Sequence, residues 1–297
     1  MKAAVPLVKS TFRLTGVTDY ITLTNALMGT ASIFFMILAV EELDSPYAED
    51  VRTKYIWAAM LCIFLSALGD IIDGPVARRY SKRKLLGGHL DIMSDFLSFC
   101  VAPALLVFIL FGRWGEATPI WTIALVLSGC WVIATGMLRL ARFQYEDASQ
   151  LPYFHGLSSP GNAMLLMSAA GVVWLQPTMG IGPGLAAHGL CASNCYLHPY
   201  FDFMMLPIML FSGAMMISER RLSKLKGGMD MKLSIVQMLL LLVAILFALV
   251  RTGTTDTGLE MEDLGFAGWL FFASLLLCLY YVTKQEPDRR SNESEQP

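Results

Sequence analysis

Charge is scarce in this chain. Asp, Glu, Lys and Arg together make up 15% of its 297 residues, hydrophobic residues make up 55%, and the mean hydropathy is +0.55. A soluble domain of this length has a similar apolar fraction but lacks such long uninterrupted apolar runs. The composition and its patterning therefore exclude a soluble globular protein.

Other features are absent as well. The net charge is only −2, and no basic stretch comes with the fold signals of a nucleic-acid-binding domain, so we expect no nucleic-acid partner. The sequence has no internal repeat and no low-complexity tract. The first apolar run is long enough to span a membrane, so we expect no cleavable signal peptide. The cysteines inside apolar runs are predicted to be small packing residues; they are Cys62, Cys100, Cys130 and Cys278.

The apolar runs predict an all-α integral membrane protein with about eight transmembrane helices. Each run holds about 17–23 residues, enough for a helix to cross about 30 Å of hydrocarbon. The candidate spans are 21–40, 56–77, 89–111, 119–138, 160–177, 201–217, 233–250 and 265–283.

The distribution of Lys and Arg predicts the orientation of these spans. Most of the 22 basic residues lie in the N-terminal segment, in the tail, and in the loops 78–88, 139–159 and 218–232. The positive-inside rule then places these loops and both termini in the cytoplasm, which an even number of spans permits. We therefore expect a multi-pass protein of the cell membrane.

Four parts are expected along the chain. Residues 1–20 form a cytoplasmic N-terminal segment, in which 4–14 fit a short interfacial helix or an ordinary basic flank. Residues 21–217 form a core of six spans, and 218–283 add a basic loop and two accessory spans. The polar tail 284–297 is expected to be a disordered cytoplasmic segment.

Four aspartates interrupt the apolar pattern at one level of the membrane. Asp70 and Asp73 lie near the end of the second span, and Asp91 and Asp95 lie in the first two turns of the third. The spacings i, i+3 and i, i+4 place each pair on one face of its helix. Adjacent helices can therefore direct four carboxylates at one point near the cytoplasmic boundary. Carboxylates that merely cap helix ends are the alternative, but capping explains neither the spacings nor the matched depth.

The residues around these carboxylates suggest their chemistry. Four converging carboxylates repel one another unless cations neutralise them, and oxygen ligands select Mg²⁺, Mn²⁺ or Ca²⁺ over zinc or copper. Gly74, Ala77 and Gly87 leave the adjacent surface bare, and Arg78 follows at headgroup depth. Two metal ions beside such a surface suit phosphoryl transfer on a lipid pyrophosphate. An ion carrier would instead need aspartates near the midplane of repeated halves.

The segment 70–95 resembles the signature of the CDP-alcohol phosphotransferases. It reads Asp70-x2-Asp73-Gly74-x2-Ala77-Arg78-x8-Gly87-x3-Asp91-x3-Asp95, and Pro75 is the one departure inside it. Four further stretches resemble motifs of the phosphatidylserine synthase branch of bacterial and archaeal type; they are ITLTNALMG (21–29), DIMSDFLSFCVAPALLVF (91–108), LRLARF (138–143) and GLSSP (156–160). Ser158 and Cys100 stand where that branch usually has proline and glycine.

This resemblance implies a six-helix core, extended here by two C-terminal helices, in a homodimer surrounded by membrane lipids. The implied enzyme transfers a phosphatidyl-type group from a CDP-lipid, either CDP-diacylglycerol or CDP-archaeol, to an alcohol and releases CMP. L-Serine is the expected acceptor, and glycerol phosphate, inositol phosphate or choline is the alternative. The implied cofactor is a pair of Mg²⁺ or Mn²⁺ ions, with Ca²⁺ as another ion that the site could bind.

The resemblance also implies roles for the matched residues. The metal ligands are Asp70, Asp73, Asp91 and Asp95, and Asp95 is also the general base on the acceptor hydroxyl. The residues around the CDP group are Asn25, Gly74, Ala77, Arg78 and Gly87. The candidates for binding the acceptor or a phosphate are Ser98, Arg139, Arg142 and Ser159. The two arginines fit this role or a role as anchors of the fourth span.

One further motif lies in a predicted outer loop. His188, Cys191, Cys195 and His198 form the symmetric pattern H-x2-C-x3-C-x2-H. A zinc site, a disulfide between Cys191 and Cys195, and free thiols all remain open for this loop.

Overall fold

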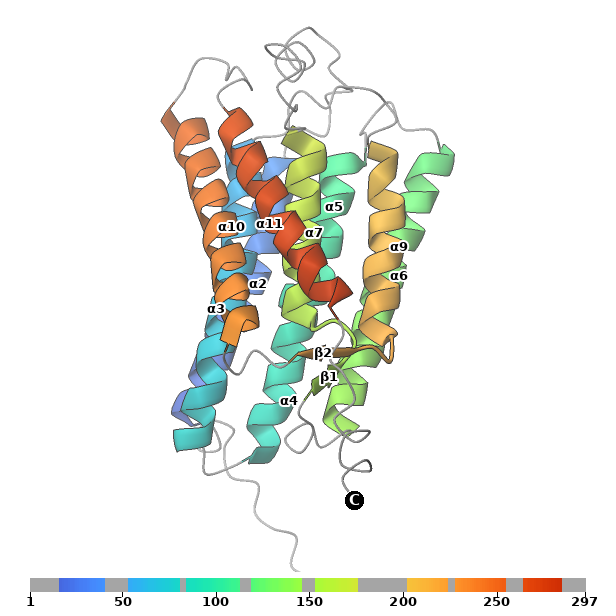
Figure 1. Ribbon diagram of the computed structural model, residues 1–297. Helices are drawn as coiled ribbons and strands as arrows, with labels where there is room; N and C mark the ends of the chain where they lie inside the picture. Colours follow the sequence, from blue (N-terminus) through green and yellow to red (C-terminus); the bar gives the residue numbers. More distant parts are fainter. Residues whose placement is uncertain are drawn as a thin grey trace, which may run out of the picture.

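The computed structural model is a bundle of helices (Figure 1). It describes residues 16–40, 53–80, 84–112, 119–145, 153–175, 202–223, 228–254 and 264–284, with the backbone alone at 17–18, 74–80, 84–86, 144–145, 153–154, 223, 228 and 252–254. The segment 4–14, the tail beyond Lys284 and the outer-loop motif at 188–198 lie outside the described residues, so their predictions stay predictions.

Six helical rods in the described part are long and apolar enough to cross a membrane, and two more are shorter. The long rods are α2 (Val17–Ala39), α3 (Thr53–Tyr80), the continuous rod of α4 (Lys84–Asp95), η2 (Phe96–Val101) and α5 (Ala102–Phe111), α6 (Pro119–Tyr145), α10 (Gly228–Thr254) and α11 (Gly265–Thr283). The shorter ones are α7 (Ser159–Leu175) and α9 (Met205–Ile217), the latter preceded by the turn η3 (Asp202–Met204). The predicted all-α membrane architecture is confirmed.

Several helices extend beyond the apolar runs that predict them. The helix α6 continues from the predicted end at 138 to Tyr145, and α10 begins at Gly228 instead of 233. Hydropathy marks the part of a helix that lies in hydrocarbon, whereas the backbone hydrogen bonds continue into the polar interface. The predicted bounds therefore describe the membrane layer and not the helix ends.

The helix α7 lies in the interior of the bundle. Most of its 17 residues are buried, and it contacts α5, α9, α11 and η2. A helix that is apolar on all sides is stable only when other helices surround it. The N-terminal end of α7 therefore brings Ser159 into the interior, between the other helices.

The C-terminal pair α10–α11 packs directly on the core. The helix α10 contacts α3, and α11 contacts α7 (Figure 1). Gly171 allows the Phe271 ring to lie against α7, and Trp57 of α3 packs on both Phe271 and Trp174, with ring centroids 5.9 and 4.8 Å away. The division into a core and two accessory spans remains a prediction, but the pair is firmly attached.

A short antiparallel ribbon connects two loops, and the apolar pattern does not predict it. Its strands are β1 (Tyr153–His155) and β2 (Arg221–Ser223). Gly156 follows β1 with a φ of 70°, and a Cβ there would lie 2.5 Å from the Met216 carbonyl oxygen, so only glycine fits. The Leu157 N–H donates to the Met215 carbonyl at 2.9 Å. These contacts fix the segment that leads into Ser159 against the end of α9.

Candidate active site

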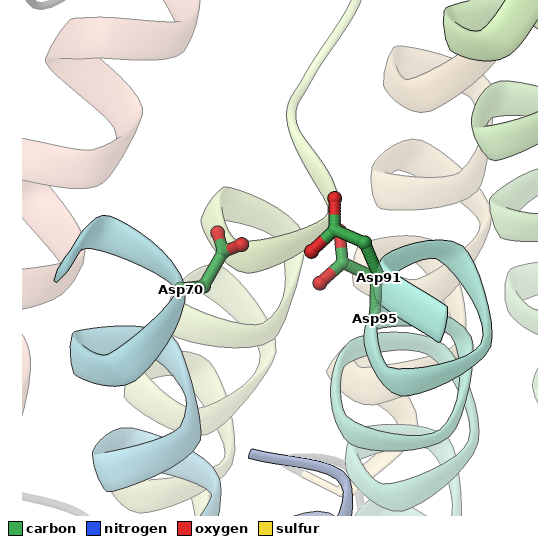
Figure 2. Close-up of side chains that lie close together, drawn as sticks. All are labelled: Asp70, Asp91 and Asp95. Carbon is green, nitrogen blue, oxygen red and sulfur yellow. The ribbon is translucent and has the colours of Figure 1, made fainter. Parts of the chain in front are cut away.

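Three of the four aspartates come together between α3 and α4. Asp70 lies on α3, and Asp91 and Asp95 lie one turn apart on α4. One carboxylate oxygen from each lies within 4.8 Å of the other two, and all three residues are partly buried. Figure 2 shows the three side chains grouped across the space between the two helices. This cluster follows from the i, i+4 spacing on α4 and from the contacts that η2 and α5, which continue the same rod, make with α3.

Asp73 is not part of this group of three. It is buried one turn farther along α3, and its Oδ2 accepts hydrogen bonds from Thr22 Oγ1 at 3.5 Å and from Asn25 Nδ2 at 3.4 Å. The structure thus brings Asp73 to α2, where Asn25, predicted to lie near the CDP group, is its partner. The i, i+3 spacing predicts a shared face with Asp70, but it does not reveal that polar residues of α2 lie there.

Small residues bring α2 close to the helices that carry the aspartates. A Cβ at Gly69 would collide with the Asn25 side chain, and a Cβ at Gly29 would collide with Ser98. The hydroxyls of Ser66 and Ser98 both donate to the Asn25 carbonyl oxygen, at 3.1 and 3.2 Å. Ser98, a predicted acceptor residue, is fully buried and connects η2 to α2.

Gly87, predicted to lie near the CDP group, lies where α4 closely approaches the start of α2. A Cβ at Gly87 would lie 2.9 Å from Asp19 Oδ1, whereas a Cβ at Gly88 would meet nothing within 4 Å. Asp19 caps the start of α2 by accepting a hydrogen bond from the Gly16 N–H at 2.7 Å. Gly74, Ala77 and Arg78 continue α3 toward this end, and their predicted roles stay predictions because their side chains are outside the described part.

Arg139 and Ser159 meet beside the aspartate cluster. Arg139 is only 9% exposed, and its Nη1 donates to Ser159 Oγ at 2.8 Å. Its guanidinium interacts electrostatically with Asp95 and Asp70. A buried guanidinium needs negative charge and hydrogen-bond acceptors around it. These two predicted acceptor residues therefore belong to the same site as the carboxylates, while Arg142 lies three residues farther along α6 and is partly buried.

Cys100 is a residue of the site that the sequence reading assigned only to packing. It is buried in η2, and its Sγ lies against Gly136 of α6. Asp95, Arg139 and Ser159 lie near its thiol. The segment Phe96–Val101 is a π-helix, which shifts the side chains that follow relative to a 3.6-residue period. The signal available in the sequence is that cysteine stands where the resembling branch usually has glycine.

The chain is similar to a known protein family over most of its helices. A model of the CDP-alcohol phosphatidyltransferase family matches residues 16–208, which is more than half of the chain and includes α2 to α7 and the first residues of α9. The chain belongs to the CDP-alcohol phosphatidyltransferase family. This confirms the family expected from segment 70–95, and together with the six long apolar helices it fits an integral membrane protein.

Several relatives in this family are about one third identical to the chain over the residues that align. A CDP-diacylglycerol–serine O-phosphatidyltransferase of Saccharomyces cerevisiae is 31% identical over 161 residues, which cover 51% of this chain and 52% of the yeast protein. One of Bacillus subtilis is 32% identical, covering 38% of this chain and 59% of that protein. An archaetidylserine synthase of Methanothermobacter thermautotrophicus is 34% identical, covering 37% and 45%. The chain spans about half the length of these relatives.

The donor set of the site fits a metal ion. Members of the family generally depend on a divalent metal, and the clustered side chains of Asp70, Asp91 and Asp95 offer only oxygen ligands. Hard divalent cations prefer such ligands. Three neighbouring carboxylates also need more positive charge than Arg139 alone supplies if all of them are ionised.

Proposed function

We propose that this member of the CDP-alcohol phosphatidyltransferase family transfers a phosphatidyl-type group from a CDP-lipid to the hydroxyl of L-serine and releases CMP. The product is phosphatidylserine or its archaeal analogue. The observation that carries the proposal is the carboxylate cluster of Asp70, Asp91 and Asp95 beside the buried Arg139–Ser159 pair. The relatives include serine phosphatidyltransferases and an archaetidylserine synthase, and their names support serine as the acceptor.

In this proposal the carboxylates of Asp70, Asp73, Asp91 and Asp95 hold two divalent cations, Mg²⁺ or Mn²⁺. When bound, such ions neutralise the pyrophosphate of the CDP-lipid and stabilise the charge that develops on CMP as it leaves. Asp73 contributes through the hydrogen bonds of Asn25 and Thr22, which hold its carboxylate in one orientation. Asn25, Gly74, Ala77, Arg78 and Gly87 surround the CDP group.

Asp95 is the general base in this proposal. The serine hydroxyl oxygen attacks the phosphorus on the lipid side of the pyrophosphate, a new P–O bond forms, and the bond to CMP breaks. Asp95 takes the hydroxyl proton during the attack. Its position beside Arg139 supports this assignment, because an acceptor held there presents its hydroxyl to the carboxylate.

Arg139 recognises the acceptor through the serine carboxylate. A guanidinium binds a carboxylate through two parallel hydrogen bonds, and burial strengthens the pair. The Ser159 hydroxyl holds one guanidinium nitrogen at 2.8 Å and so fixes the plane of the group. Choline has no carboxylate, and the phosphates of glycerol phosphate and inositol phosphate are larger and more highly charged. Arg142, the next basic residue on α6, is a second candidate for a phosphate or for the interface.

The proposed membrane arrangement follows the basic loops. Both termini and the aspartate cluster face the cytoplasm, where CDP-lipid and serine meet, and the protein functions as a homodimer among membrane lipids. The cluster lies close to the ends of the apolar windows of α3 and of the α4–α5 rod, which end at Asp73 and begin at Gly87. That depth suits a pyrophosphate at the level of the lipid headgroups.

An acceptor competition tests the proposed function. Purified protein in lipid nanodiscs is given CDP-diacylglycerol or CDP-archaeol with Mg²⁺ or Mn²⁺, and CMP release is measured with L-serine, glycerol phosphate, inositol phosphate and choline in turn. We expect CMP release to depend on L-serine. D-Serine and ethanolamine serve as matched controls, because the first misplaces the carboxylate and the second lacks it. Release that depends on another alcohol instead of L-serine would overturn the assignment of the acceptor.

A further inference from the structure

A cavity of about 150 Å³ lies between the C-terminal helix pair and the core. The helix α3 contributes Ala67, Asp70 and Ile71 to its wall, and the pair contributes Leu233 and Met238 of α10 and Leu277 of α11. Most of the lining is apolar. The six residues named above lie within candidate membrane spans. An apolar cavity of this size can hold a hydrocarbon group of about six carbon atoms.

Asp70 belongs both to this cavity and to the carboxylate cluster. The cavity therefore adjoins, at Asp70, the place where the proposed function puts the pyrophosphate. A lipid bound there has to direct its chains from a charged headgroup toward apolar surroundings. The cavity offers such surroundings next to Asp70. Chain carbons that fill it leave the polar surroundings of the headgroup and gain van der Waals contacts with the apolar wall.

Polar contacts hold the two helices of the pair together and attach α11 to α7. Ser274 Oγ of α11 lies 2.9 Å from Ser168 Oγ of α7 and accepts a hydrogen bond from Gln237 Nε2 of α10 at 3.3 Å. Lys284, just after α11, forms an ion pair with Asp230 of α10 at 2.5 Å, and Asp230 also lines the cavity. The helix pair therefore forms a wall of the cavity whose position is held by these contacts.

We propose that α10 and α11 form part of the substrate site, and that their cavity binds the segment of one hydrocarbon chain nearest the glycerol of the CDP-lipid. This inference rests on the proposed function, because it requires a CDP-lipid at the aspartates. The matched family region ends at residue 208, so α10 and α11 add this wall from outside that region. The pair thus contributes to the choice of lipid chain, in addition to any role as a membrane anchor.

Photolabelling tests where the chain lies. The probe is a CDP-lipid with a diazirine on the chain carbons next to the glycerol, in a diacyl and a diether form, bound to the full-length protein in nanodiscs. We expect labelled peptides that contain Leu233–Met238 or Leu277–Tyr281, and we expect unlabelled CDP-lipid to prevent this labelling. Saturable labelling of the other helices alone would overturn the proposal. Labelling by a phosphatidylcholine diazirine that CDP-lipid does not displace would identify a bilayer lipid and overturn it as well.

Substitutions in α10 give a second, functional test. Ser234 lines the cavity, so Ser234→Phe should fill it and raise the KM for a CDP-lipid about tenfold, with a much smaller change for CDP-glycerol, which has no hydrocarbon chain. Ile235 is the next residue, does not line the cavity and is 56% exposed, so Ile235→Phe is the matched control. If Ser234→Phe does not fold, Met238→Ala is compared with Leu239→Ala. Only Met238→Ala should change the ratio of the KM values for CDP-lipids with straight and with branched chains. Equal effects of variant and control would contradict the proposal.

The two proposals fail in different ways. Serine-dependent CMP release by a protein whose α10–α11 pair is never labelled would overturn the cavity proposal and leave the proposed function intact. Labelling of the pair that CDP-lipid prevents, in a protein that releases CMP with another alcohol only, would overturn serine as the acceptor and leave the cavity proposal intact. A protein that neither releases CMP nor binds the probe would overturn both.

Discussion

Replacement of Asp95 by asparagine separates its role as a base from the roles of the other aspartates. Asp95 lies within 4.8 Å of Asp70 and Asp91 and interacts with Arg139. Asparagine keeps the shape of the side chain and removes its ability to take a proton. A general base contributes about 10²–10⁴-fold to the rate, so Asp95→Asn should cost about 3–5 kcal/mol of transition-state stabilisation.

Binding of CDP-lipid should respond differently. Asp70 and Asp91, which would hold the cations that bind the pyrophosphate, remain in Asp95→Asn, so its CDP-lipid affinity should fall less than that of Asp70→Asn. The assay is serine-dependent CMP release together with CDP-lipid binding, both measured on protein in nanodiscs with Mn²⁺. Each variant is first compared with the wild type for folding, by its thermal unfolding in detergent.

Ser94→Ala is the matched control for this prediction. Ser94 is buried one residue before Asp95, and its hydroxyl donates to the Thr22 carbonyl at 3.2 Å. Loss of this neutral hydrogen bond should lower stability by about 0.5–1.5 kcal/mol and leave serine-dependent turnover close to that of the wild type. Near-normal turnover in Asp95→Asn, or an equal loss in Ser94→Ala, would refute the reasoning that Asp95 is the base.

Four further predictions concern the metal, the acceptor, the packing and the orientation. Chelation by EDTA should abolish CMP release and added Mn²⁺ should restore it; activity that survives chelation would contradict the metal site. Ser159→Ala should raise the KM for L-serine about 10-fold and leave CDP-lipid affinity constant, because Arg139 loses a hydrogen bond. Steady-state kinetics and a parallel CDP-lipid binding assay measure the two quantities. Equal changes in both would contradict a role of Ser159 in acceptor binding. Gly69→Ala should lower the Tm more than Gly88→Ala, because only the first Cβ meets a side chain, that of Asn25; equal Tm values would count against the close approach of α2. A cysteine introduced at position 46 should react with an impermeant maleimide on intact cells, and one in the loop 218–232 should not; the reverse labelling would overturn the orientation.

Local spacing in the sequence was sufficient to predict the centre of the site. Asp91 and Asp95 lie one turn apart on the same helix, so their shared face follows from the helical repeat. The meeting with Asp70 follows from the pairing of consecutive antiparallel spans, which a short polar connection favours. The family signature in 70–95 adds to the same conclusion, and the family match confirms the family that this signature predicts. Apolar runs likewise predict the eight helices, because hydrocarbon thickness sets their length.

Contacts between distant segments were not predictable in the same way. Asp73 accepts hydrogen bonds from Thr22 and Asn25, about fifty positions earlier in the chain, and no spacing rule encodes that partner. The π-helical turn at Phe96–Val101 alters which side chains face the site, so the places of Ser98 and Cys100 differ from those that a regular helix gives. The β1–β2 ribbon depends on two loops that meet only after α7 and α9 have packed.

The burial of Arg139 shows a further limit of sequence reading. Its place at the predicted cytoplasmic end of an apolar run fits an anchor in contact with lipid headgroups as well as a ligand in the site. The structure distinguishes the two because Arg139 is buried, bonded to Ser159 and close to Asp95. That outcome depends on α7 entering the interior of the bundle, which hydropathy alone does not predict.

The most direct test of the central claim is the incorporation of radiolabelled L-serine into lipid. Purified protein in nanodiscs is incubated with radiolabelled L-serine, CDP-lipid and Mn²⁺, and the lipid extract and the CMP are both quantified. The account predicts one serine-containing phospholipid, formed in amounts equal to the CMP released and lost in Asp95→Asn. No label in the lipid fraction, while another alcohol gives a phospholipid with release of CMP, would contradict it.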